Sequence, residues 1–173
     1  MSLDRLWAGW RTTYIQAATA DPSVNGPGTD GRSLFEGILH SGLPDAETYI
    51  LWRGAHCFAI LNAYPYGSGH VLVLPQRAVA DLHELTPDES DELWAGVNLA
   101  VRAVRTAYRP DGVNIGANLG SAAGAGVPDH LHLHVLPRWS ADSNFMTAVA
   151  EARVLPEPLD ATWTKLTQAW PHD

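Results

Sequence analysis

The chain carries the stretch Asp129-His130-Leu131-His132-Leu133-His134-Val135-Leu136-Pro137, in which histidine alternates three times with an apolar residue. A period of two is typical of a half-buried β-strand. Alternate side chains of a strand share one face and stand about 7 Å apart, so we expect three imidazoles on one face and the apolar spacers in a core. Because imidazole can act near neutral pH as a nucleophile, acid, base or ligand, this strand is the candidate functional site.

One long helix is predicted on the N-terminal side of the histidines. It begins after Thr86, because Pro87 stands at the first helical position and Glu89 completes a capping-box pattern. A single apolar stripe at spacings of three and four then marks the face that is expected to be buried. The stripe consists of Leu93, Val97, Val101, Val104 and Tyr108. A second, amphipathic segment at 161–169 predicts a C-terminal helix.

The remaining apolar runs predict a sheet around this helix. Runs bounded by turn residues indicate further strands at 49–53, 57–61, 70–74 and 113–119, with a short apolar run at 154–156. The connection between the last of the four and the histidine strand is too short for a crossover, which favours antiparallel neighbours. We therefore predict an α+β fold with a mostly antiparallel sheet in a single domain.

Length and composition exclude several classes of protein. The 173 residues are 46% hydrophobic and 17% charged, as in an ordinary globular domain. A net charge of −8 argues against a protein that coats nucleic acid or binds anionic membranes. The single cysteine, Cys57, rules out an internal disulfide framework. No apolar run approaches about 20 residues, and the N-terminus lacks a signal-peptide pattern, so we expect a cytoplasmic protein.

A loop of small residues leads into the histidine strand. The run Gly120-Ser-Ala-Ala-Gly-Ala-Gly126 exposes backbone N–H groups, which can bind phosphate oxygens without lysine. Arg138, just beyond the histidines, supplies a side chain that suits bidentate phosphate contacts. Together these features favour nucleophilic catalysis on phosphorus by an imidazole.

Metal binding is the alternative chemistry for a histidine strand. His130 and His132 could share a zinc ion, but the third histidine lies about 13 Å further along from His130, so another ligand would be needed. Asp129 and Asp142 are the nearby carboxylates. A third possibility is a nucleotide sensor that binds without catalysis.

The sequence resembles the histidine triad (HIT) family. His130-Leu-His132-Leu-His134-Val-Leu looks like the family signature, and Asn62…Gly69-His70-Val-Leu-Val-Leu-Pro75 is similar to its second signature. Further motifs resemble the actinobacterial branch, which contains diadenosine tetraphosphate phosphorylases. They are Leu6-Trp-Ala-Gly-Trp-Arg11, Leu61-Asn-Ala-Tyr-Pro-Tyr66, Asn118-Leu-Gly120, Pro137-Arg-Trp139 and Asn144-Phe-Met146.

The resemblance implies a role for each histidine. His132 would attack the α-phosphate and form a nucleotidyl-histidine intermediate, and His134 would contact the phosphate near the leaving group. His130 and His70 would support the nucleophile from behind. Asn62 would bind the ribose hydroxyls. The catalytic set is therefore predicted without a cofactor and without a metal.

The phosphates would be held by the loop that precedes the triad. Asn118 and the backbone of Gly124, Ala125 and Gly126 would bind them, with Arg138 as a further substrate-binding residue. The expected activity is hydrolysis or transfer of a nucleotidyl group on dinucleoside polyphosphates or related conjugates. Phosphorolysis of diadenosine tetraphosphate is the alternative.

The resemblance also predicts the organisation of the chain. One HIT domain would consist of an aromatic arm and mobile loop at 1–32, a core at 33–140 and an extension at 141–173, with a five-stranded antiparallel sheet. Two subunits would pair through their long helices and edge strands into a homodimer. The protein would bind a nucleotide, not a nucleic acid or a membrane.

Two departures from the family pattern concern the site. Many bacterial relatives carry Cys-x-x-Cys for a structural zinc, where this chain has Ser33 and Glu36, so the zinc is expected to be lost. In the phosphorylases a serine that is thought to help the phosphate acceptor often stands four residues before the first triad histidine, where this chain has Gly126.

Overall fold

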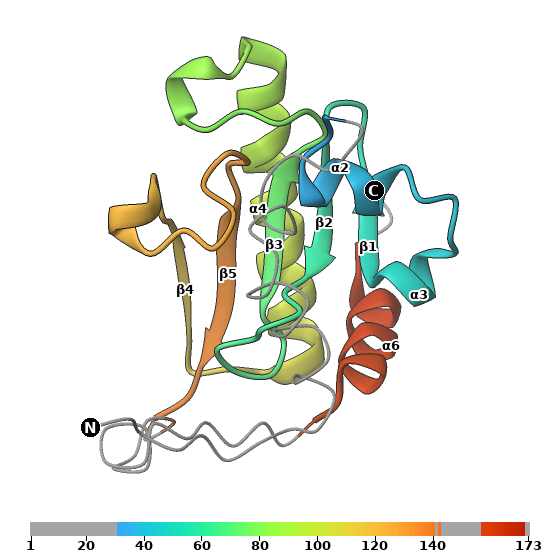
Figure 1. The fold of residues 1–173 in the computed structure, drawn as a ribbon. Helices are drawn as coiled ribbons and strands as arrows, with labels where there is room; N and C mark the ends of the chain where they lie inside the picture. The colour runs from blue at the N-terminus through green and yellow to red at the C-terminus, as the bar shows by residue number, and fades with distance from the viewer. Residues whose placement is uncertain (1–30, 141, 143–156, 172–173) are drawn as a thin grey trace, which may run out of the picture.

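A five-stranded sheet forms the centre of the molecule (Figure 1). The computed structural model describes residues 31–140, 142 and 157–171. The strand order is β1-β2-β3-β5-β4, and every neighbouring pair is antiparallel. The strands are β1 (Ile50–Arg53), β2 (Cys57–Leu61), β3 (Val71–Pro75), β4 (Gly112–Ala117) and β5 (Leu133–Arg138). The prediction of an α+β fold with a five-stranded antiparallel sheet is confirmed.

The long helix α4 (Pro87–Tyr108) covers one face of the sheet. It begins as predicted, with reciprocal hydrogen bonds between Thr86 and Glu89. Val101 and Tyr108, which the apolar stripe placed in the core, are only partly buried. The helix instead meets the sheet through a closely packed row that includes small residues. This row consists of Leu93, Gly96, Val97, Ala100, Ala103 and Val104.

Two short helices, which the sequence analysis missed, precede the sheet. They are α2 (Leu34–Leu39) and α3 (Asp45–Thr48). Ser33 caps α2 and forms a capping box with Glu36, a Ser-x-x-Glu pattern that the sequence displays. Helix α2 lies on the face opposite to α4, where Phe35 and Leu39 pack into a second apolar cluster with β2 and β3 side chains. The sheet is therefore covered on both faces, and the site lies on the α2 side.

Strand β5 is shorter than expected. It begins at Leu133, which pairs with Val73 of β3 and Ala117 of β4, and His130–His132 precede the strand. The backbone N–H of Leu131 instead donates to the carbonyl of Val79, in the segment after β3, at 2.6 Å. The apolar alternation therefore continues beyond the ladder because Leu131 packs in the same core as the strand residues.

The C-terminal helix α6 (Leu159–Ala169) packs beside β1 and α4 (Figure 1). Its Trp163 donates an indole N–H to the carbonyl of Ile50 at 2.9 Å. The helix confirms the amphipathic segment at 161–169. The predicted run at 154–156 and nearly all of the predicted arm and loop at 1–32 lie outside the described residues. The three-part division of the domain stays a prediction.

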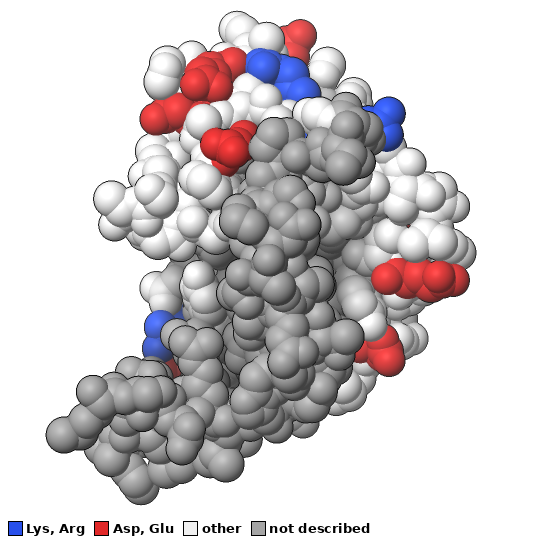
Figure 2. Space-filling view, viewed as in Figure 1, with Lys and Arg blue, Asp and Glu red and all other residues white. Residues whose placement is uncertain are grey.

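The described surface and helices bear on two predictions from composition, the acidic net charge and the lack of a segment that could span a membrane. Figure 2 shows Asp and Glu in several separate groups on the visible face and Lys and Arg at fewer places. Two 3-10 turns, η2 (Leu82–Glu84) and η3 (Ser121–Ala123), complete the described elements. None of the helices in the described residues is long and apolar enough to cross a bilayer.

Candidate active site

The histidine stretch divides its side chains between the two faces of the sheet. Leu131, Leu133 and Val135 are at most 3% exposed and face α4, as the alternation predicts. The rings of His132 and His134 lie on the opposite face with their centroids 5.1 Å apart. The alternation, which continues from β5 back to His132, therefore places two imidazoles side by side on the α2 side of the molecule.

The ring of His130 is fully buried and hydrogen-bonded at both nitrogens. Its Nε2 lies 2.8 Å from the carbonyl of Pro75, and its Nδ1 lies 2.6 Å from Oγ of Ser33. A carbonyl only accepts, so Nε2 carries the proton and Nδ1 accepts from the Ser33 hydroxyl. Burial lowers the pKa of His130 and favours this neutral form.

His132 has the geometry of a nucleophile. Its Nδ1 lies 2.7 Å from the carbonyl of His130, so that nitrogen must carry the proton and donate it. The neutral ring then keeps an unprotonated Nε2. Burial lowers the pKa of His132 below its ordinary value, which preserves the neutral form near pH 7. Phe35 of α2 lies against this ring with centroids 5.4 Å apart and limits its movement.

His134 receives the opposite tautomer through a chain of donors. The backbone N–H of Tyr66 donates to Nδ1 of His70 at 3.0 Å, so the other ring nitrogen of a neutral His70 carries the proton. That Nε2–H lies 2.9 Å from Nδ1 of His134 and donates to it. His134 therefore presents a protonated Nε2, which is buried and has no hydrogen-bond partner among the described residues. Burial is the main cause that lowers the pKa of His134 to about 4, and the nearby His132 adds to this effect.

His70 and Asn62 lie together behind His134. The amide nitrogen of Asn62 lies 3.4 Å from Nδ1 of His70, and its Oδ1 accepts from the N–H of Tyr64 at 2.9 Å. His70 hydrogen-bonds His134, whereas the support of His132 comes from the carbonyl of His130. The family resemblance placed both His130 and His70 behind His132. In the structure His130 lies behind His132, whereas His70 lies behind His134.

The small-residue loop follows β4 at the same end of the sheet. Asn118 directs its amide N–H toward the carbonyl of Gly124 at 3.5 Å, across the loop. Gly120 and Gly124 adopt positive φ angles of 78° and 91°, which a glycine tolerates without strain. Ala125 and Gly126 continue the loop toward the triad. The connection from β4 to β5 therefore brings Asn118 and the predicted phosphate loop together.

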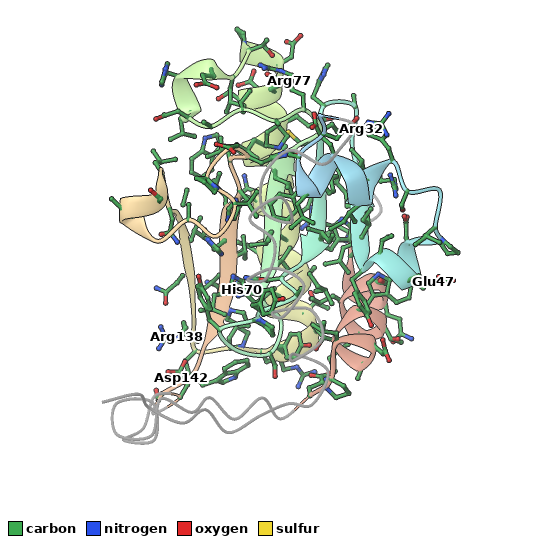
Figure 3. All side chains as sticks on the ribbon, viewed as in Figure 1. Arg32, Glu47, His70, Arg77, Arg138 and Asp142 are labelled. Carbon is green, nitrogen blue, oxygen red and sulfur yellow. The ribbon has the colours of Figure 1, made fainter. Side chains whose placement is uncertain are left out.

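Arg138 lies at the other end of β5. It pairs with Gly112, whereas His134 pairs with Gly116, so four strand residues (about 13 Å) separate Arg138 from His134. Its guanidinium binds Asp142 at 2.6 Å and Oδ1 of Asn114 at 2.8 Å. Figure 3 shows Arg138 beside Asp142 at the lower end of the sheet. The structure does not bring Arg138 to the Gly120–Gly126 loop.

The residues at the predicted position of the lost zinc do not form a metal ligand set. Glu36 accepts backbone N–H groups from Ser33 at 2.8 Å and Ala78 at 3.0 Å, and both nitrogens of His130 are engaged. Burial opposes ionisation of Glu36, but these hydrogen bonds hold its pKa below the ordinary value. No group of three or more His, Cys, Asp or Glu side chains within the described ranges is arranged to hold a metal.

Sequence reasoning missed three residues of this site. Ser33 contacts His130, Tyr66 lies against His70 and His134, and Asn114 lies with Asn118 beside His134 along an open cavity. Asn114 could have been found, because even-numbered residues of β4 share one face and Gly116 stands opposite His134. Ser33 could not, since 97 residues separate it from His130.

The fold and the paired histidines define a protein of the histidine triad type, and comparison with known proteins agrees. The chain belongs to the family described as HIT domain, whose model matches residues 44–141. It is 38% identical over 168 residues to AP-4-A phosphorylase from Mycobacterium tuberculosis (strain ATCC 25618 / H37Rv), covering 97% of this chain and 85% of that protein. The predicted resemblance to the family and to its actinobacterial phosphorylase branch is confirmed.

Two further relatives extend the comparison. Over 93 residues the chain is 39% identical to bis(5'-nucleosyl)-tetraphosphatase [asymmetrical] from Schizosaccharomyces pombe. The matched region covers 54% of this chain and 50% of that protein. Among solved structures, a Zn-bound histidine triad family protein from Mycobacterium smegmatis matches with a TM-score of 0.63 and 28% identity, over 79% of this chain and 91% of that one.

Proposed function

We propose that this protein is an enzyme that cleaves dinucleoside polyphosphates or related nucleotide conjugates by nucleotidyl transfer through His132. The names of the relatives, a phosphorylase and a tetraphosphatase, support the substrate class. The observation that carries the proposal is the 2.7 Å hydrogen bond from Nδ1 of His132 to the carbonyl of His130, since it leaves Nε2 as a lone-pair nucleophile.

In the first step Nε2 of His132 attacks the α-phosphorus. A P–N bond forms, and the bond from phosphorus to the bridging oxygen breaks with its electron pair on the departing polyphosphate. His134 donates the hydrogen bond of its Nε2–H to that oxygen as negative charge develops there. In the second step water or phosphate attacks the same phosphorus, the P–N bond breaks, and the proton of an attacking water passes to solvent.

The binding residues follow the sequence prediction. The loop from Gly124 through Ala125 to Gly126, together with Asn118, would hold the phosphates through backbone and amide N–H groups. Asn62 would reach the ribose, and Arg138 would contribute at the far end of β5 through its contact with Asn114. No step requires a metal or an organic cofactor.

The test replaces the nucleophile and compares products. His132→Ala should lower turnover of diadenosine tetraphosphate by at least about 10³-fold, because the covalent route is lost. The circular dichroism spectrum and AMP binding should persist. His83→Ala is the matched control, since the His83 side chain is 78% exposed and lies beside Asp81, away from the triad. Activity of His132→Ala within a few-fold of the wild-type rate would refute the nucleophile assignment.

Phosphorolysis is the second candidate, favoured by the 38% identity to a protein named AP-4-A phosphorylase. With phosphate as acceptor, diadenosine tetraphosphate yields ADP and ATP, whereas water yields AMP and ATP. Chromatography of reactions with and without added phosphate therefore identifies the acceptor directly.

The assembly and location rest on the sequence and its relatives. We propose a homodimer, supported by the exposed apolar side chains of Ile115 on edge strand β4 and Trp94 on α4, which are 48% and 50% exposed. Light scattering on the purified protein measures the mass of the assembly. A cytoplasmic location stays a prediction.

A further inference from the structure

An open cavity of about 220 Å³ lies beside His134, on the side of β4. Gly116 stands directly opposite His134 in the β4–β5 ladder, and the absence of a side chain there leaves room next to the imidazole. A Cβ at position 116 would meet nothing within 4 Å. This volume is well above the roughly 10–15 Å³ that a single hydrolytic water requires.

The cavity lining includes one amide whose orientation is fixed by a neighbouring side chain. The His134 ring lines the cavity, and its Nε2, which the donor chain from Tyr66 and His70 leaves protonated, is a buried donor without a partner among the described residues. Arg138 can only donate, so the Asn114 atom at 2.8 Å from it is the amide oxygen. The amide NH₂ of Asn114 is therefore available to the cavity, which Asn114 lines.

The remaining lining carries no charge. It consists of Tyr66, Ile115, Ala117, Asn118 and Leu136. Without a carboxylate in the lining, a phosphate oxygen meets donors and no like charge. Tyr66, which stacks on His134 with ring centroids 5.6 Å apart, adds an aromatic wall.

We infer that this cavity is the subsite for the departing polyphosphate, and that Asn114 is a specificity-determining residue that binds it through the amide NH₂. The inference rests on the proposed function, because it needs His132 to attack the α-phosphorus and His134 to face the leaving oxygen. The nucleotide that stays bound to His132 would occupy a different place, since His132 does not line the cavity. The cavity therefore selects among substrates by the size and charge of the leaving group.

The test compares two substrates with the same AMP half. Diadenosine tetraphosphate releases a nucleoside polyphosphate, whereas adenosine 5′-phosphofluoridate releases a single fluoride ion. Effects on the nucleoside end cancel in the ratio of the two kcat/KM values. Gly116→Val fills the cavity, and its β-branched side chain suits a strand. Asn114→Asp replaces the donor NH₂ by a carboxylate oxygen that repels phosphate.

Each variant should lower kcat/KM for the tetraphosphate at least about 10-fold more than for the fluoridate. Gly112→Val and Asn98→Asp are the matched controls, because Gly112 lies on β4 outside the cavity and Asn98 lies exposed on α4. A shifted ratio in either cavity variant supports the inference. An unchanged ratio in both would overturn it while leaving the proposed function intact. A wild-type protein that cleaves neither substrate would overturn the proposed function and this inference with it.

Discussion

His132 and His134 are two residues apart and carry opposite tautomers. Nδ1 of His132 faces a carbonyl and must be protonated, whereas Nδ1 of His134 faces a donor N–H of His70 and must accept. One ring therefore presents a lone pair at Nε2 and the other presents a proton. A single residue type thus presents both a lone pair and a hydrogen-bond donor, according to what lies behind each ring.

The acid limb of the pH–rate profile should lie below pH 6.5. His132 attacks only when it is neutral, and burial lowers its pKa below the ordinary histidine value. As the pH falls, activity is therefore retained until the pH passes this lowered pKa. The measurement is kcat/KM for diadenosine tetraphosphate from about pH 4.5 to about pH 8, a range that brackets the pKa of an ordinary histidine. An acid limb at or above pH 6.5 contradicts the assignment, provided that circular dichroism shows a folded protein.

Gly126 offers a direct test of acceptor choice. A Cβ at this position would meet nothing within 4 Å, and its φ is not positive, so a serine fits without strain. Because the phosphorylases often carry serine here, Gly126→Ser should increase the share of ADP formed in the presence of phosphate. Gly126→Ala is the control that adds a Cβ without a hydroxyl. Equal ADP shares in the two variants would remove Gly126 from acceptor choice.

At the scale of elements, the close approach of α4 to the sheet depends on a glycine. A Cβ at Gly96 would lie 2.9 Å from both Cζ3 of Trp52 and Cγ1 of Val73, closer than packed carbon atoms come. Helix α4 carries Glu92 to the β1–β2 turn, where the carboxylate accepts three backbone N–H groups, from Ala55, His56 and Cys57. Helix and turn are therefore held together by both packing and hydrogen bonds.

Gly96→Ala should lower the free energy of unfolding by about 1–3 kcal/mol, because the added methyl overpacks this contact. Gly37→Ala in α2 is the matched control, since a Cβ there meets nothing within 4 Å and alanine is the better helix former. Urea denaturation of both variants measures the difference. A Gly96→Ala protein as stable as the Gly37→Ala protein would show that the helix shifts away at no cost.

At the scale of the whole molecule, resistance to acid depends on buried groups whose pKa differs between the folded and the unfolded chain. Glu89 is 6% exposed and is bound by Arg77 at 2.6 Å and by the Thr86 N–H at 2.8 Å. The hydrogen bonds from Arg77 hold the pKa of Glu89 at about 2, below its ordinary value of 4.5. A depressed carboxyl pKa stabilises the fold above about pH 4.5, and this stabilisation is lost as the pH falls toward 2.

Glu89→Gln should therefore lower the free energy of unfolding by about 2 kcal/mol at pH 7, through loss of charged hydrogen bonds. The difference from the wild type should shrink between pH 4.5 and 2, since the wild-type carboxyl takes up a proton there in the unfolded chain first. Urea denaturation at a series of pH values provides the comparison. A difference that stays constant down to pH 3 would contradict this account.

Periodicity and capping by themselves determined most of the fold. The alternation at 129–137 placed Leu131, Leu133 and Val135 in the core and the histidines on one face, and Thr86 with Glu89 located the start of α4. These patterns are readable because strand and helix periods are local properties of the chain. The family signatures then led to the nucleotidyl chemistry proposed for this site.

The tertiary structure alone decided which nitrogen of His130 and of His134 is protonated. The partners that assign His130 and His134, namely Ser33, Pro75 and His70, are between 55 and 97 residues away along the chain. The displacement of Arg138 from the phosphate loop and the cavity opposite Gly116 likewise follow from the pairing register of β4 and β5. Contacts between distant residues depend on how the sheet closes, and no local pattern encodes that closure.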